Sequence, residues 1–129
     1  ALGDVFAQVA LADNPTMDAA ALDKLRSKPL RAPLIVIVVA RLQEHPKVPE
    51  VEQLLSAGCA AHGILLAAHA RGFAGIWRTG SMAFHPGVYR SLGLKPNEKI
   101  VGFLYLGTRE GAPRVPPRYD VCDFVEYWG

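Results

Sequence analysis

The chain has 129 residues, half of them hydrophobic and a fifth charged, with a formal net charge of +2. This length and balance fit one globular domain, residues 1–129, while the small charge and scattered basic residues argue against nucleic acid as a partner. The longest apolar run falls short of the ~20 residues that a membrane span needs, so no membrane association is expected. Cys59 and Cys122 lack metal or redox spacing, and free thiols are typical of the cytoplasm.

The first third of the chain predicts two helices and a strand. Residues 1–12 carry apolar side chains at helical spacing and end at turn residues. Thr16 can cap a second helix that runs to about Ser27. Residues 34–40 (LIVIVVA) are continuously apolar and largely β-branched. We expect this strand to be covered on both faces, in the middle of a sheet with helices on either side.

The longest predicted element is a helix from about Pro49 to Arg71, which begins with a proline and two glutamates in its first turn. Residues 56–70 are apolar or small on nearly every side, interrupted only by His62 and His69, so we expect the helix to be buried all round. Gly72 can provide the left-handed residue that ends it. Its small side chains allow close approach of another helix, at a subunit interface or within an internal core.

A short extended segment, Phe73 to Thr79, follows this helix and ends at Gly80. It places an aromatic ring (Trp77), a guanidinium (Arg78), a hydroxyl and an unhindered backbone next to one another in sequence. That combination suits a flat, anionic ligand. Neither a dinucleotide fingerprint nor a phosphate loop is present, so a plain connection between a helix and a strand is the alternative interpretation.

The last third predicts a short helix at Pro86–Ser91, a second buried strand at residues 100–106, and an extended arm at residues 109–129. Prolines keep the arm out of a central strand position, and its aromatic end requires a surface to bury on. We therefore expect the arm to reach across a partner. The residues concerned are Pro113, Pro116, Pro117, Phe124, Tyr127 and Trp128.

Other combinations of reactive side chains are weaker. Cys59 and His62 lie three apart on one helix, but a thiolate needs an electropositive, partly open site, so we interpret Cys59 as a buried thiol packed among alanines. His62 and His69 lack a third ligand, and we predict no metal site. A hydrolytic triad is discounted because no Gly-x-Ser-x-Gly elbow is present. Its candidate members are Ser56, His85 and Asp120.

Three segments carry a family resemblance: RAPLIVIVVA, then KVPEVEQLLSAGCAAHGILLAAHARGFAGIWRTG, then VYRSLGLKPNEKIVGFLYLGT. In this order and with these gaps they resemble the nitroreductase family of FMN-dependent oxidoreductases, in particular its small bacterial YdjA-like subgroup. The resemblance covers about Leu22 to Thr108. It is specific because three separate segments match, whereas the Trp-Arg-Thr-Gly sequence alone would be weak.

The resemblance implies an α+β fold with a mixed sheet flanked by helices, and a homodimer with the long central helix in its interface. It implies FMN bound at that interface and a C-terminal arm, residues 109–129, that embraces the other subunit. It also implies two binding segments. The residues that match the FMN-binding segment are Trp77, Arg78, Thr79 and Gly80. The backbone amides of the last two are implied to lie near the reactive edge of the flavin ring. Those matching the NAD(P)-associated segment are Ala67, Ala68, His69, Ala70, Arg71 and Gly72.

The implied reaction passes hydride from NAD(P)H through FMN to a small-molecule acceptor such as a nitroaromatic or a quinone. FMN carries the chemistry, so no catalytic side chain is expected. The family's N-terminal Arg-Arg-Ser type segment, which grips the FMN phosphate, is absent from these residues, and Arg31 and Arg78 could contact phosphate instead. Two hypotheses follow: an FMN oxidoreductase seen without its N-terminal portion, and a non-catalytic dimeric binding or assembly module without flavin.

Overall fold

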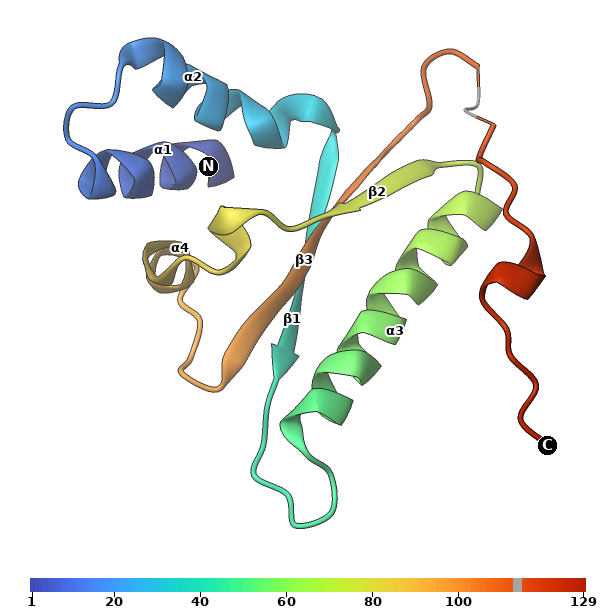
Figure 1. Ribbon diagram of the computed structural model, residues 1–129. Coiled ribbons are helices and arrows are strands. Elements are labelled where there is room, and N and C mark those ends of the chain that lie inside the picture. The colour runs from blue at the N-terminus through green and yellow to red at the C-terminus, as the bar shows by residue number, and fades with distance from the viewer. Residues whose placement is uncertain (113–114) are drawn as a thin grey trace.

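The computed structural model describes residues 1–112 and 115–129 (Figure 1). Pro113, one of the prolines predicted to extend the arm, lies outside the described residues. The helices and strands lie close to the positions that the sequence predicts. They are α1 (Leu2–Asp13), α2 (Ala19–Ser27), β1 (Leu34–Arg41), α3 (Glu50–Ala70), β2 (Ala74–Arg78), α4 (Pro86–Ser91) and β3 (Glu98–Gly107), with 3-10 turns η1 (Lys28–Arg31), η2 (Ser81–Ala83) and η3 (Val121–Asp123).

The three described strands form one sheet in the order β1-β3-β2. Both pairings are antiparallel, with Ile35 and Ile76 each opposite Tyr105 on the two sides of β3. Helix α3 packs against one face of the sheet, and α1 and α4 lie on the other side (Figure 1). The expected α+β architecture with a long central helix is therefore present. The mixed sheet that the resemblance implied is antiparallel throughout here, because none of the other described residues forms a further, parallel strand.

The placement of β1 corrects the sequence prediction. The strand expected in the middle of the sheet lies at its edge, and β3 occupies the middle. Five of the eight β1 residues are only partly buried, whereas β3 contains four consecutive buried residues, Gly102–Tyr105. A continuous apolar, β-branched run indicates that both faces are covered, but it carries no information about whether both edges are paired. The outer edge of β1 has no strand partner among the described residues.

The core lies between the sheet and the α1/α4 side. Phe6 of α1 meets Phe103 of β3 edge-on, with ring centroids 5.7 Å apart. Such an arrangement places the positive edge of one ring on the negative face of the other. The buried members of this cluster are Phe6, Val9, Ala83, Val88, Ile100, Phe103 and Tyr105. Because Ala83 belongs to η2, the core also anchors the segment that follows β2.

Side-chain caps fix the helices on this side of the sheet. The N-cap of α2 is Asp18, whose carboxylate accepts from the Ala21 amide at 2.7 Å. The predicted cap, Thr16, instead donates its hydroxyl to Asn14. His85 caps α4: its Nδ1 accepts from the Gly87 amide at 2.9 Å, and its Nε2 lies 2.8 Å from Asp13 of α1. His85 therefore ties α4 to the end of α1.

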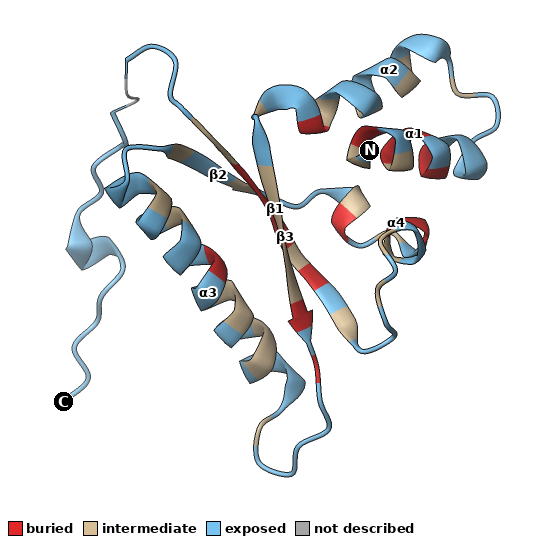
Figure 2. Cartoon of the chain, turned by 180° about the vertical axis from the view of Figure 1, so that it is seen from behind, coloured by how far each residue is buried: buried red, intermediate tan, exposed pale blue. Residues whose placement is uncertain are grey.

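Helix α3 is not buried all round in this chain. The prediction that this helix is buried on every side is therefore wrong for the single chain. Only Ala61 is buried, while Leu55 and Leu66 on other sides of the helix keep 65% and 56% of their surface exposed (Figure 2). The absence of a charged face indicates that the helix avoids water, but one sheet covers only one of its sides. The outer apolar side has no cover among the described residues of this single chain.

The length of α3 also corrects the argument against membrane association. At 21 residues, α3 is long and apolar enough to cross a membrane by length and composition alone, and no other helix in the described part of the chain is. Core helices of soluble proteins meet the same criterion, and α3 packs one side against all three strands. Its composition therefore gives only weak support to a membrane span.

Candidate functional site

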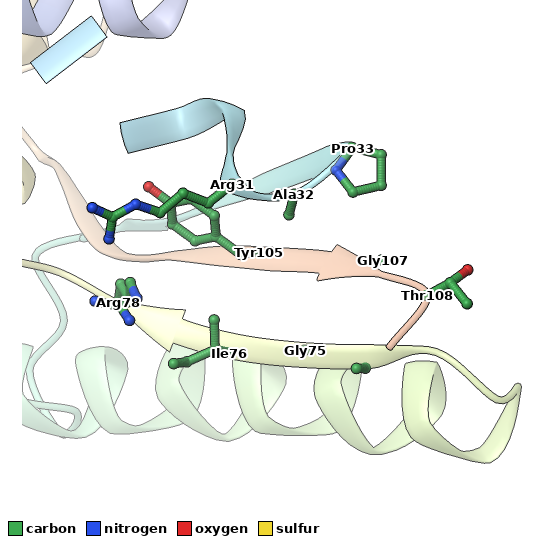
Figure 3. Close-up of a pocket in the computed structure, with 10 residues that line it drawn as sticks. Arg31, Ala32, Pro33, Gly75, Ile76, Arg78, Tyr105, Gly107 and Thr108 are labelled. Atoms are coloured by element: carbon green, nitrogen blue, oxygen red, sulfur yellow. The ribbon is translucent and has the colours of Figure 1, made fainter. Parts of the chain in front are cut away.

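The alternation of β2 divides the predicted flavin-binding segment between the two faces of the sheet. Successive side chains of a strand point to opposite faces. Trp77 lies on the α3 face, where it lines a hollow with α3 residues. Ile76 and Arg78 lie on the other face, where both line a groove with Tyr105 (Figure 3). The sequence-adjacent indole and guanidinium are thus separated by the sheet rather than gathered in one site.

The indole of Trp77 is held between α3 and β3. Its Nε1 donates to the carbonyl of Val101 at 3.2 Å. A Cβ at position 102 would overlap the indole nitrogen, and a Cβ at position 58 would lie 3.7 Å from the far edge of the ring. Gly102 therefore leaves the space that the indole fills, as glycine within a strand often does where another group approaches closely. In this chain Trp77 has a structural role in joining α3 to the sheet.

The turn after β2 exposes free backbone donors. Gly80 has a φ of +74° and a ψ of 179°, a conformation essentially restricted to glycine, and a Cβ there would meet nothing within 4 Å. Within the described residues, neither the Thr79 nor the Gly80 amide donates a hydrogen bond to another protein group. Both residues are exposed. The turn therefore presents two N–H groups that no described residue of the chain accepts from.

Three cationic side chains line one hollow together with this turn. A hollow of about 250 Å³ is lined by Thr79 and Gly80 together with Lys28, Arg31 and Arg78. Arg31 and Arg78 also line a neighbouring groove of about 280 Å³ on the same face of the sheet. The positions arise from the fold, because η1 leads into edge strand β1 while Arg78 ends β2 on the far side of β3.

The three cations lack acidic partners in the described part of the chain. The ion pairs there involve the chain start, Arg26 and His85, and none includes Lys28, Arg31 or Arg78. Like charges held near one another without counter-charges produce a positive potential that favours an anionic ligand. Together with the free amides, this arrangement suits a ligand that carries negative charge and hydrogen-bond acceptors.

The predicted nicotinamide-nucleotide segment, residues 67–72, lies at the end of α3. His69 and Gly72 line a further hollow of about 250 Å³ with Arg109, and Gly72 has the expected positive φ of +83°. Ala68 lines a small apolar hollow nearby. The members of this segment are Ala67, Ala68, His69, Ala70, Arg71 and Gly72. The structure thus gathers only His69 and Gly72 at one hollow.

The burial predicted for Cys59 is wrong in this chain. Cys59 is exposed rather than buried among alanines. With His62 and Trp77 it lines an apolar hollow of about 540 Å³. Within the described residues, no three His, Cys, Asp or Glu side chains are grouped as a metal site. The residues that line this hollow include no Lys or Arg, so its lining lacks the cation that would activate the thiol as a nucleophile.

The hydrolytic triad is not assembled. His85 contacts Asp13, and Asp120 accepts a hydrogen bond from the Cys122 amide at 2.9 Å. That bond lowers the pKa of the Asp120 carboxyl, because it stabilises the charged form. Ser56 lies on α3, on the opposite side of the sheet from His85 (Figure 1). The three side chains therefore do not form a catalytic triad.

Sequence reasoning missed Lys28, Ile76 and Tyr105 as lining residues. Strand alternation is the signal that identifies Ile76, since it lies two positions from Arg78 on the same face. Tyr105 carries the one hydroxyl among the apolar residues 100–106, and its register opposite Ile76 places it beneath the groove. Lys28 follows from no sequence signal, because its position depends on the path of η1 over the sheet.

Comparisons with known proteins support the same fold. The sequence profile of the Nitroreductase family matches residues 2–108. The chain is 53% identical over 91 residues to "Putative NAD(P)H nitroreductase YdjA" of Escherichia coli strain K12, a match that covers 70% of this chain and 50% of that protein. The chain spans about half the length of the curated relatives it matches.

Two solved structures share the arrangement of helices and strands. A nitroreductase-like family protein from Bacillus cereus superposes with a TM-score of 0.71 at 20% identity, covering 98% of this chain and 63% of that one. A nitroreductase with bound FMN from Bacteroides fragilis gives 0.62 at 22% identity, covering 99% and 70%. The fold is that of the nitroreductase-like α+β proteins. The chain belongs to the nitroreductase family, which confirms the resemblance of its three segments.

Proposed function

We propose that this chain is the flavin-facing part of an FMN-dependent oxidoreductase that passes hydride from NAD(P)H to a nitroaromatic or quinone-type acceptor. Family membership and the name of the Escherichia coli relative support an oxidoreductase that uses NAD(P)H. The single observation that carries the proposal is the turn at Thr79–Gly80. Its two amides line one hollow with three cations, and none of these groups has a protein partner among residues 1–112 and 115–129.

The residues present fit FMN in charge and in hydrogen bonding. FMN, when bound, supplies the chemistry by accepting hydride and returning two electrons to the acceptor. The Thr79 and Gly80 amides can donate to the acceptor atoms at the ring edge without any titrating side chain. Arg78 and Lys28 supply positive charge for an anionic ligand. Arg31, from the opposite side of the hollow, adds a third cation.

Trp77 contributes differently from the sequence expectation. Its indole packs on the other face of the sheet, where it holds β2 against α3. We assign it the role of fixing the strand that carries the turn. The segment at residues 67–72 remains a proposed contact for the nicotinamide nucleotide, supported by the hollow that His69, Gly72 and Arg109 share.

A second copy of the chain is the proposed cover for α3. The outer side of α3 exposes Val51, Leu55 and Leu66, and an apolar hollow of about 540 Å³ lies beside it. Exposed apolar patches of this kind mark interaction sites. In the arm, Phe124 and Trp128 are also exposed. In a homodimer with α3 in the interface and the arm against the other subunit, the outer side of α3 and the aromatic side chains of the arm would be buried. A cytoplasmic location stays a prediction.

A non-catalytic dimeric module without flavin is the second candidate. The observation that favours it is the small size of the candidate site. The hollow at Thr79–Gly80 has a volume of about 250 Å³ and the groove beside it about 280 Å³. Both volumes lie below the roughly 300–1,000 Å³ that is usual for ligand pockets. A partner subunit, or further residues of a longer chain, would enlarge the site. Uptake of FMN by the purified protein separates the two candidates.

The function is tested on the full-length protein as it is naturally produced. We expect the purified protein to be yellow, to bind FMN stoichiometrically, and to oxidise NADH or NADPH faster when a nitroaromatic is added. Arg78→Ala should weaken FMN binding about tenfold, because a charge-assisted hydrogen bond is lost. Arg90→Ala, an exposed cation on α4, is the matched control and should bind FMN normally. A colourless protein that takes up no added FMN contradicts the proposal.

A further inference from the structure

Strand β3 continues past the point where β2 leaves the sheet. The last paired residue of β2 is Arg78, opposite Phe103, whereas β3 extends back to Glu98. On its other edge β3 pairs with β1, but the register shifts at Val101, which has no partner residue there. This one-residue bulge lies where β2 turns away toward Thr79–Gly80. Bulges are common next to functional sites, where they end a pairing or redirect a side chain.

Two side chains satisfy backbone groups of β3 at this bulge. The indole Nε1 of Trp77 donates to the Val101 carbonyl at 3.2 Å, and the amide of Ile100 donates to the hydroxyl of Tyr89 at 3.0 Å. Ile100 is a member of the buried core cluster. A backbone group that is buried without a partner costs about as much free energy as a lost hydrogen bond. Trp77 and Tyr89 therefore stabilise the bulge beyond the end of the β2 pairing.

The same two side chains flank the turn along the chain. Trp77 precedes the turn in β2, and Tyr89 follows it in α4. They approach β3 from opposite faces of the sheet, because Trp77 lies on the α3 face and Tyr89 packs against the core on the α1/α4 side (Figure 1). The segment that carries the turn thus begins and ends at one point of β3.

The backbone between the turn and Tyr89 is locally hydrogen-bonded. The Gly80 carbonyl accepts from the Ala83 amide at 3.1 Å, and the His85 carbonyl accepts from the Tyr89 amide at 3.2 Å. Only Phe84 separates the end of η2 from the N-cap of α4. The position of Tyr89 is therefore transmitted to Gly80 through two short hydrogen-bonded turns.

We infer that the bulge of β3 anchors both ends of the flavin turn, and that Tyr89 is a positioning residue that acts through this bulge. By holding α4 to β3, Tyr89 fixes the direction in which the Thr79 and Gly80 amides point. Tyr89 acts at a distance from the ligand, because it lines neither the hollow at the turn nor the groove beside it. Its effect on flavin binding rests on the proposed function, whereas its effect on the geometry of the turn does not.

Tyr89→Phe tests the inference, because it removes the hydroxyl and keeps the ring. Chemical shifts and order parameters of the Thr79 and Gly80 amides are measured by NMR on isotope-labelled full-length protein freed of flavin. We expect both amides to shift, and their order parameters to fall from about 0.85 toward the values below about 0.6 that mark flexible backbone. The FMN dissociation constant should rise about threefold, because a smaller fraction of the molecules presents both donors.

Two further variants show whether the bulge is the cause. Trp77→Phe removes the other hydrogen bond to the bulge and should loosen the same two amides from the β2 side. Gln53→Ala is the control for a general loss of stability, because its side chain holds the loop before α3 by hydrogen bonds to the backbone of Gln43 and Val48. This control should lower the urea concentration at the unfolding midpoint and leave the turn amides unchanged.

Two results overturn the inference. One is a folded Tyr89→Phe or Trp77→Phe protein whose turn amides keep their wild-type shifts and order parameters. The other is an equal response to Gln53→Ala, which would trace the change to lower stability instead of the bulge. A protein that takes up no FMN, but whose turn loosens in Tyr89→Phe, refutes the proposed function and leaves the positioning role standing. A yellow protein whose turn and FMN affinity are unaffected by Tyr89→Phe does the reverse.

Discussion

Replacement of Gly102 by alanine should displace the Trp77 indole, because a Cβ at position 102 would overlap its Nε1. Overpacking of this kind costs about 1–3 kcal/mol. The hydrogen bond from Nε1 to the Val101 carbonyl would be lost as well, at about 0.5–1.5 kcal/mol. Removing a flexible strand glycine returns about 0.5–1 kcal/mol. We therefore expect Gly102→Ala to lower the free energy of unfolding by about 1–3 kcal/mol.

Gly58→Ala is the matched control, because its Cβ would lie 3.7 Å from the same indole, an ordinary contact distance. Alanine in a helix is favoured over glycine by about 0.8–1.0 kcal/mol, so this variant should be as stable as the wild type or more so. Urea unfolding is followed by circular dichroism. All variants are compared at the same protein concentration, because the stability of a dimer depends on protein concentration.

A double-mutant cycle locates the cause. In a Trp77→Leu background, Gly102→Ala should cost little, because the indole that it displaces is absent. The reasoning is refuted if Gly102→Ala unfolds at the wild-type urea concentration. It is also refuted if the variant is equally destabilising with and without the indole, because the strain would then lie elsewhere.

Three further changes test other parts of the account. Gly80→Ala introduces a side chain at a φ of +74°, at a cost of about 1–3 kcal/mol, and should weaken FMN binding in a titration; unchanged affinity would show that the turn does not face the ligand. His85→Ala removes the N-cap of α4 and should lower stability by about 0.5–2 kcal/mol in urea unfolding, with His85→Asn recovering part of it through its own capping oxygen; no loss would contradict the capping role. Leu55→Glu charges the outer side of α3 and should convert a dimer to a monomer in light scattering, and a persistent dimer would place the interface elsewhere.

Local sequence signals predicted the elements of this fold well. The β-branched run at residues 34–40, the proline that precedes α3 and the glycine after it correspond to the observed strand and helix ends. These signals depend on neighbouring residues in the chain, which fix backbone conformation directly. The capping of α2 differed because Asn14 takes the Thr16 hydroxyl and leaves Asp18 to cap.

Burial and strand order could not be predicted from the same signals. An apolar strand and an apolar helix indicate that water is excluded, but not which neighbour excludes it. Strand β1 lies at a sheet edge and α3 is largely exposed in the single chain, so the apolar surface of both exceeds what this chain covers. The uncovered apolar surface is the reason for the dimer proposed above.

The candidate site groups residues that are distant in sequence and separates two that are adjacent. Trp77 and Arg78 are neighbours in the chain, yet the pleat of β2 sends them to opposite faces of the sheet. Arg31 and Arg78 are far apart in the chain and line the same groove, because β1 and β2 flank β3. The alternation of side chains along β2 is enough to predict that Trp77 and Arg78 lie on opposite faces. The proximity of Arg31 and Arg78 can be predicted only when the order of the strands in the sheet is known.

The central claim is that the free amides of Thr79 and Gly80 face the flavin. It is tested most directly by the amide resonances of isotope-labelled full-length protein, freed of flavin and titrated with FMN. We expect the Thr79 and Gly80 amides to shift strongly on binding, while Gly93, which follows α4 and lines neither hollow beside the turn, stays unchanged. Binding of FMN that leaves both amides unmoved would contradict the account.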